Sequence, residues 1–182
     1  DALPGAEATP LARAGLKKVV DYQDLAYGRA YLDRLEDAAA RDAQAGGAEH
    51  GFAFTANAAK YLANAMCYDD IIRVADLKTR APRTARIDQE MRKGDEHLIR
   101  VTEYVHPGAA EFVSLMPAGL GRWIEARPRV WRGIDRLVNR GRRIRSDRVL
   151  GFLMFYTLGG LRRWRRRLLR HAVEEAHWTE WL

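Results

Sequence analysis

The sequence predicts a mainly α-helical protein, a helical bundle-like domain with at most one or two short extended segments. Two observations support this class. Apolar residues recur at spacings of three and four over most of the 182 residues, as on one face of a helix. Only residues 98–105 read as a strand, ended by Pro107 and Gly108. Because 47% of the residues are apolar, the chain can supply a real core.

The domain organisation expected from composition is simple. Residues 1–10 are rich in Pro, Ala and Gly, start without Met and lack the layout of a signal peptide. We therefore expect them to be a linker from a domain further upstream. Residues 11–182 are long enough for one domain and are expected to form a single helical accessory domain.

The first third of the chain carries clear helix signals. A helix is expected over residues 11–22, and Asp24 is a suitable N-cap for a second helix that runs to about Gln44. The glycines at 46 and 47 should end that helix. Thr55 is expected to cap a third helix, which continues or bends into residues 66–80.

The middle of the chain is expected to break this helical pattern. Pro82 interrupts the helix because it has no N–H and disfavours helix in the preceding residue. The strand-like residues 98–105 cannot make a sheet alone. They need a partner strand from a part of the protein outside this chain, or they form an extended connector.

Helical patterns return from Ala109 onward, interrupted by Pro117 and Pro128. The most apolar run, residues 149–161, contains three glycines and falls short of the ~18 apolar residues that a membrane-spanning helix needs. We therefore predict that this run is buried core and that the chain has no membrane span.

Charge is distributed unevenly along the chain. Residues 1–121 contain 15 Lys and Arg against 18 Asp and Glu, whereas residues 122–182 contain 16 arginines against 6 acids. Residues 129–148 are predicted to form an amphipathic helix with a basic face. The candidate basic contact surface comprises Arg142, Arg143, Arg145, Arg162, Arg163 and Arg166.

Three kinds of partner fit this Arg-rich third. They are an acidic protein surface, the phosphates of a nucleic acid and an anionic membrane surface. A structural role or a protein interface is favoured because Arg forms bidentate pairs with carboxylates, although Arg suits phosphate equally. The remaining alternative is a solvated surface that also binds acidic patches in the same polypeptide.

The residue types that carry catalysis are not arranged for it. The two serines, Ser114 and Ser146, stand outside a Gly-x-Ser-x-Gly motif, and the single cysteine, Cys67, is best explained as a small buried residue. Glu174 and His177 form one Glu-x-x-His motif, whereas a di-iron bundle needs two such motifs and two more glutamates. We therefore expect no catalytic residue, metal site or cofactor in this chain.

The stretch MCYDDIIRVADLKTR, residues 66–80, concentrates charge on one side of a helical wheel. The spacing predicts the ion pairs Asp69–Arg73 and Asp76–Arg80, each with the acid first, which is the favourable order. An apolar side opposes them. The candidate interface or ligand face comprises Asp69, Asp70, Arg73, Asp76, Lys78 and Arg80.

The same stretch resembles a segment of the C-terminal region of indolepyruvate ferredoxin oxidoreductases of the beta-subunit type. That segment has the form Met-x-Tyr-acid-Asp-x-x-Arg-Val-Ala-Asp-Leu-Lys-Thr-Arg, which residues 66–80 match. Residues 20–35 and 151–172 are also similar. The resemblance therefore covers most of the chain.

This resemblance implies an accessory domain of a cytoplasmic complex that converts aryl 2-oxoacids to aryl-acetyl-CoA, with ferredoxin as electron acceptor. Thiamine diphosphate and iron–sulfur clusters are then expected elsewhere in the complex. The expected partners are an upstream oxidoreductase domain of the same polypeptide and the catalytic subunit. The alternative is an independent helical module that binds nucleic acid through its basic end.

Overall fold

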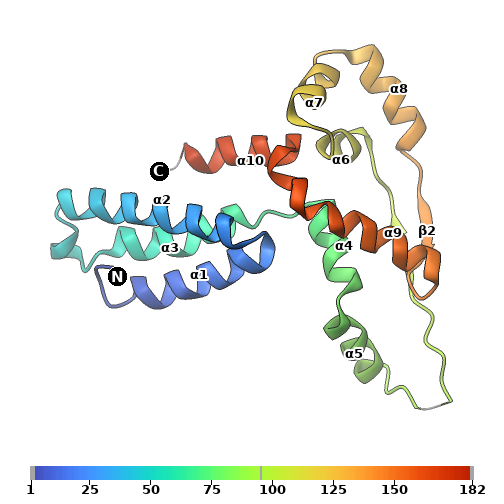
Figure 1. Cartoon of the computed structure of the whole chain (residues 1–182), viewed down its shortest axis with the longest axis horizontal. Coiled ribbons are helices and arrows are strands. Elements are labelled where there is room, and N and C mark those ends of the chain that lie inside the picture. Colours follow the sequence, from blue (N-terminus) through green and yellow to red (C-terminus); the bar gives the residue numbers. More distant parts are fainter. Residues whose placement is uncertain (1–2, 95, 181–182) are drawn as a thin grey trace. The chain divides into compact units, whose positions relative to one another are not determined.

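The computed structural model describes residues 3–94 and 96–180, and over these residues the chain forms ten α-helices, two 3-10 helices and one two-stranded sheet (Figure 1). The predicted mainly α-helical class is confirmed. The chain divides into two compact units where a single domain was expected. Residues 3–68 and 173–180 belong to unit 1, and residues 69–172 belong to unit 2.

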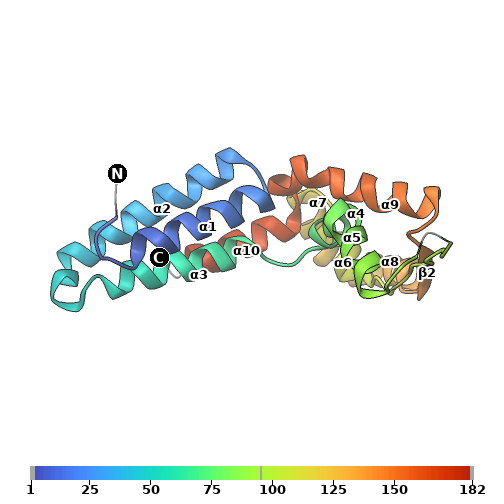
Figure 2. The ribbon, with the colours of Figure 1, turned by 90° about the horizontal axis from the view of Figure 1, so that it is seen from below.

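Unit 1 is built on three helices that lie side by side (Figure 2). They are α1 (Ala8–Tyr22), α2 (Leu25–Gln44) and α3 (Ala53–Met66), with the 3-10 helix η1 (Gly47–His50) between the last two. The final residues of α10 (Leu169–Thr179) complete the unit, and Trp178 is buried in its core. The core is largely aromatic and aliphatic, as the helical periodicity predicts.

The first helix begins earlier than the sequence analysis expected. Residues 8–10 were assigned to a linker, but α1 starts at Ala8, whose side chain is fully buried. Alanine is the best helix former and its burial is favourable, so the helix extends through these residues.

The predicted N-cap of α2 is confirmed, whereas the predicted N-cap of α3 is wrong. Asp24 caps α2, since its Oδ1 accepts a hydrogen bond from the Tyr27 N–H at 2.8 Å. Thr55 lies inside α3, and its N–H and hydroxyl both donate to Asp42 Oδ2, at 2.9 and 2.7 Å. A carboxylate from α2 thus satisfies an N–H of the first turn of α3, which a local reading of the sequence could not reveal.

A buried tyrosine fixes the distance between the helices of unit 1. The Tyr31 hydroxyl donates to the Ala59 carbonyl of α3 at 2.7 Å. Burial, with a smaller contribution from Cys67, raises the pKa of Tyr31 to about 12. A Cβ on Gly15 of α1 would lie only 2.4 Å from that hydroxyl, so only glycine lets the helices approach this closely.

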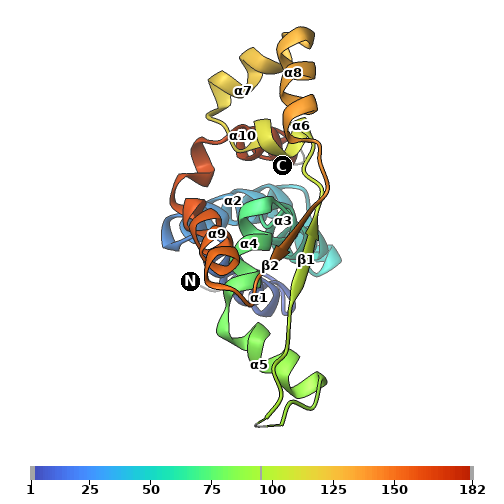
Figure 3. The same ribbon diagram turned by 90° about the vertical axis from the view of Figure 1, so that its right-hand side faces the viewer.

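Unit 2 contains the remaining elements. Its sheet pairs β1 (Thr102–Val105) with β2 (Arg142–Arg145) in antiparallel register, with Thr102 opposite Arg145 (Figure 3). Its helices, besides the start of α10, are α4 (Ile71–Thr79), α5 (Ala81–Glu90), α6 (Ala109–Ser114), α7 (Ala118–Glu125), α8 (Pro128–Val138), α9 (Val149–Gly160) and the 3-10 helix η2 (Leu161–Arg167).

The sheet corrects two expectations about unit 2. The partner of the strand-like segment is β2 of this chain, whereas a strand from outside these 182 residues or an extended connector was expected. Residues 129–148 are not one amphipathic helix, because α8 ends at Val138 and β2 follows. Pairing with β1 supplies hydrogen bonds to the β2 backbone, and Gly141, just before β2, disfavours a longer helix.

The largest correction concerns α9. The apolar run was predicted to be core, but only Phe155 of this helix is buried. Six large apolar side chains are between 40% and 83% exposed: Val149, Leu150, Phe152, Leu153, Met154 and Tyr156. Over residues 3–94 and 96–180, each helix is either too short or not apolar enough to span a lipid bilayer.

Candidate functional site

The stretch at residues 66–80 is interrupted where the two units meet in the sequence. It was expected to lie on one helical wheel, but α3 ends at Met66 and α4 begins at Ile71. Asp70 has an extended backbone, and its Oδ1 accepts from the Arg73 N–H at 2.6 Å. This side chain starts a new helix, as an N-cap aspartate does.

The first residues of the stretch belong to the core of unit 1. Met66 and Tyr68 are buried, and the Met66 carbonyl accepts from the Tyr27 hydroxyl at 3.1 Å. The Tyr68 ring meets the Tyr22 ring edge-on, with 5.5 Å between centroids. Cys67 is half-buried and packs against the same core, a little more exposed than predicted.

The N-cap aspartate of α4 also anchors the C-terminal arginines. Arg165 Nε and Nη2 donate to the two carboxylate oxygens of Asp70 at 2.7 and 3.2 Å. Both side chains are buried, with exposed fractions of 1% and 5%. Such a bidentate pair binds α4 to η2 across 95 residues of sequence. Sequence reasoning missed Arg165, because nothing local distinguishes it from the neighbouring arginines.

A second charge cluster binds α4 to the sheet. Glu103 on β1 is buried, and it accepts hydrogen bonds from Lys78 Nζ and, at 2.7 Å, from Arg83 Nη2. Burial raises the pKa of Glu103, but the hydrogen bonds and charges of Lys78 and Arg83 outweigh it and hold the pKa below its ordinary value. The Lys78 ammonium also lies 5.6 Å from the centre of the Phe155 ring of α9.

The outer side of α4 carries part of the predicted ion pairs. Asp76 Oδ2 lies 2.7 Å from Arg80 Nη2, which confirms that pair, and 3.2 Å from Arg73 Nη1. Asp69 precedes the helix and is exposed, so it does not lie on the helical face that was predicted to pair it with Arg73. Its carbonyl accepts from Arg170 Nη2 at 3.5 Å.

The apolar side of α4 packs against α9. Ile72 and Ala75 of α4 and Phe155 of α9 are buried. A Cβ on Gly159 would lie 3.1 Å from the Asp76 backbone, so the two helices approach closely at this glycine. The face predicted as an interface or ligand site is therefore mostly engaged within unit 2, and α4 connects η2, β1 and α9.

The predicted basic surface is divided between two elements. On β2, Arg142 and Arg143 are exposed, whereas Arg145 is half-buried and its Nε donates to Asp147 at 3.1 Å. This hydrogen bond and the charge of Arg145 hold the pKa of Asp147 below its ordinary value. On η2, two arginines are exposed and one is half-buried: Arg163, Arg166 and Arg162 respectively. These elements precede and follow α9 in the chain.

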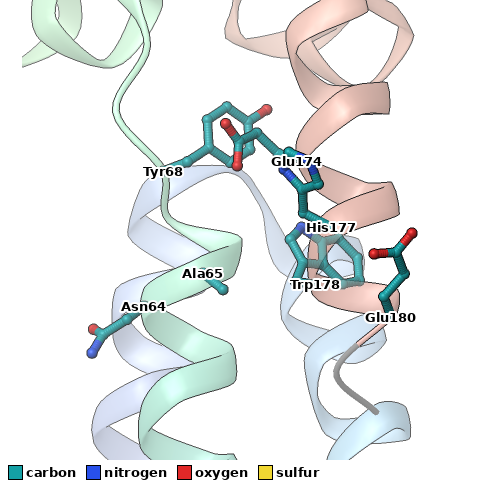
Figure 4. A pocket seen from close by; sticks show the side chains of 7 residues that line it. All are labelled: Asn64, Ala65, Tyr68, Glu174, His177, Trp178 and Glu180. Atoms are coloured by element: carbon teal, nitrogen blue, oxygen red, sulfur yellow. The ribbon is translucent and has the colours of Figure 1, made fainter.

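Unit 1 contains a pocket of about 340 Å³ that brings the Glu-x-x-His motif together with aromatic rings (Figure 4). It is lined by Asn64, Ala65, Tyr68, Glu174, His177, Trp178 and Glu180. Over residues 3–94 and 96–180, no three His, Cys, Asp or Glu side chains are placed to hold a metal ion. The carboxylates at this pocket favour positively charged groups.

Unit 2 has a smaller pocket of about 220 Å³ beside the Glu103 cluster. Lys78, Arg83 and Lys93 line it together with apolar residues, among them Phe152 of α9. Lys78 and Arg83 both bind Glu103, so its carboxylate balances one of their two positive charges within the chain.

Comparison with known proteins gives one family. Residues 8–182 match the model of a family of unknown function, DUF6537, and the chain belongs to that family. No curated protein and no solved structure matches the chain.

Proposed function

We propose that this member of the DUF6537 family is a helical accessory domain of an indolepyruvate (aryl 2-oxoacid):ferredoxin oxidoreductase. Its role is to pack against an upstream oxidoreductase domain and the catalytic subunit of a cytoplasmic complex. Thiamine diphosphate and the iron–sulfur clusters belong to those other parts.

One observation carries this proposal: charged residues of the stretch at residues 66–80 hold unit 2 together. Asp70 binds Arg165 in a buried pair and Lys78 binds Glu103 in a partly buried one, so both positions are tied to the fold by charge pairs. Loss of one partner of a buried pair costs roughly 3–5 kcal/mol. A chain that keeps the stretch MCYDDIIRVADLKTR is thus expected to keep this scaffold, which supports relatedness to the proteins that the stretch resembles.

The reaction proposed for the whole complex is the oxidative decarboxylation of an aryl 2-oxoacid. The bond between its carboxylate and its carbonyl carbon breaks and releases carbon dioxide. Coenzyme A takes the remaining acyl group as a thioester, its thiol losing a proton, and the electron pair passes to ferredoxin. The role of the domain in this reaction is to assemble the complex.

The test uses the full-length protein that carries this chain, purified with its partner subunit. We expect ferredoxin reduction that requires both indolepyruvate, or another aryl 2-oxoacid, and coenzyme A. Deleting residues 8–182 should lower turnover and subunit association at least about tenfold. The deletion removes the proposed contact surface, and a few interface residues carry most of the binding energy. Bound thiamine diphosphate and iron should remain, which separates an assembly defect from loss of the catalytic parts.

Two results would contradict the proposal. The first is that no aryl 2-oxoacid supports ferredoxin reduction. The second is a deletion variant that assembles and turns over normally. A sub-micromolar affinity for nonspecific DNA or RNA that falls steeply with salt would instead favour a nucleic-acid-binding module.

A further inference from the structure

Helix α9 presents an apolar face that the other described elements of unit 2 leave uncovered. Around its helical wheel, Phe155 and Gly159 face α4, and the opposite arc contains large apolar side chains. The most exposed are Val149 at 74%, Leu150 at 83% and Tyr156 at 63%. No residue of α9 is charged. A helix that is apolar on all sides is ordinarily buried, and a contiguous exposed apolar patch marks an interaction site.

Exposed arginines flank α9 at both ends of the helix. Arg148 immediately precedes α9 and is exposed, and the exposed Arg163 and Arg166 follow in η2. No carboxylate occurs between residues 148 and 167. The surface therefore combines an apolar centre with cationic ends.

We infer that the exposed face of α9 docks a protein surface of the same complex, one with apolar side chains at its centre and carboxylates at its border. This inference rests on the proposed function, because it identifies the surface by which the accessory domain joins the complex. Arg is common at protein interfaces and pairs bidentately with carboxylates, as Arg165 does with Asp70 inside this chain.

A second copy of the chain fits this surface poorly. In an antiparallel pair of α9 helices, Arg148 of one copy would approach Arg163 and Arg166 of the other. In a parallel pair, each Arg148 would approach its own equivalent. Both arrangements bring like charges together at the border of a low-dielectric contact, which is unfavourable.

A lipid surface also fits less well than a protein. A helix that lies in the membrane interface carries its basic residues along its own polar face. Helix α9 has no polar face, since the side opposite its exposed arc packs on α4. A protein surface with a matching groove accounts for both the apolar arc and the separated cations.

Photo-crosslinking in the purified full-length complex tests this inference. A photoreactive phenylalanine analogue replaces Leu153, which is 47% exposed on α9, or, as a matched control, Leu137, which is 70% exposed on α8. We expect the probe at 153 to crosslink, at least about five-fold more than the probe at 137, to a protein segment of the complex outside residues 8–182. That segment should contain Asp or Glu near the linked residue.

Charge reversal tests the acidic border separately. Arg148→Glu should lower the crosslinking yield from position 153 several-fold, whereas Arg129→Glu, at an exposed position of α8, should leave the yield unchanged. A glutamate at 148 is compatible with folding because it precedes the N-terminus of α9, where negative charge is favourable.

Several outcomes would overturn the inference. They are a crosslink to a second copy, to residues 3–68 of the same chain or to lipid in vesicles of anionic phospholipid, a yield at 153 no higher than at 137, or equal yields in the two arginine variants. Because crosslinking needs no turnover, failure here with normal ferredoxin reduction would overturn only the docking surface. Absent ferredoxin reduction would instead overturn the proposed function.

Discussion

The pair of Asp70 and Arg165 shows how one residue can determine the stability of unit 2. Truncation of Arg165 leaves the carboxylate of Asp70 buried without its cation. We expect Arg165→Ala to lower the free energy of unfolding of unit 2 by roughly 3–5 kcal/mol. Hydrogen–deuterium exchange of the α4 amides in increasing urea measures this loss.

The matched control for this substitution lies two residues away. Arg163 is exposed and stacks over the Trp164 ring at 5.6 Å, so Arg163→Ala should change the free energy by no more than about 0.5 kcal/mol. Equal effects of the two substitutions would mean that the buried pair does not stabilise the unit.

Glu103 is expected to make unit 2 sensitive to acid. Its pKa is lowered in the folded state by Lys78 and Arg83, despite burial. The stabilisation is therefore complete above the ordinary carboxyl pKa of about 4.3 and is lost as pH falls through the lower folded pKa. At pH 7, Glu103→Gln should destabilise unit 2 by roughly 2–3 kcal/mol, because hydrogen bonds to a charged group are replaced by neutral ones.

The pH dependence separates charge from packing in that substitution. The stability difference between wild type and Glu103→Gln should shrink as pH falls below about 4, where the wild-type carboxyl takes up its proton. Urea unfolding at a series of pH values measures it. A difference that stays constant down to pH 2 would assign the effect to packing alone.

At the scale of elements, the contact between α9 and β2 depends on a glycine. A Cβ on Gly151 would lie 2.0 Å from the Arg145 carbonyl oxygen, so a larger residue must displace backbone. We expect Gly151→Ala to destabilise unit 2 by roughly 1–3 kcal/mol, although alanine favours helix. Gly160→Ala is the control, because a Cβ at this position meets nothing within 4 Å. This substitution should be neutral or slightly stabilising. Thermal unfolding of the two variants side by side decides this, and a Gly151→Ala variant as stable as wild type would contradict the close contact.

The elements also show which features a sequence pattern can predict. The start of α2 at Asp24 was predicted, because N-capping involves neighbouring residues only. The start of α3 was missed, since its first turn uses Asp42 from another helix. The pairing of β1 with β2 was missed for the same reason, because it joins residues about forty positions apart.

At the scale of the whole molecule, the uneven charge of the chain is partly balanced inside each unit. In unit 2, Asp70 from the acidic part of the sequence binds Arg165 from the basic part. In unit 1, Arg34 lies 3.6 Å from Glu175 of α10 and 4.5 Å from the Trp178 ring. Part of the Arg-rich third therefore stabilises the chain itself, whereas Arg148, Arg163 and Arg166 beside α9 are exposed.

The structure also changed the roles assigned to the candidate site at residues 66–80. Its residues in 66–80 were identified from sequence, but their roles were not. Asp70 and Lys78 have structural roles whose partners, Arg165 and Glu103, are distant in sequence. Helix α9, whose exposed face we propose as a docking surface, had been assigned to the core.

The sequence by itself determined the mainly α-helical class, the N-cap of α2 and the helix break before Pro82. It also singled out residues 66–80, whose resemblance to an oxidoreductase family stays a prediction. These features depend on neighbouring residues and on the period of a helix. Only the tertiary structure decided that Arg165 is buried and that α9 is exposed. The physical reason is that a charge pair 95 residues apart leaves no local pattern, and a helix that is apolar on every side does not indicate which side is covered.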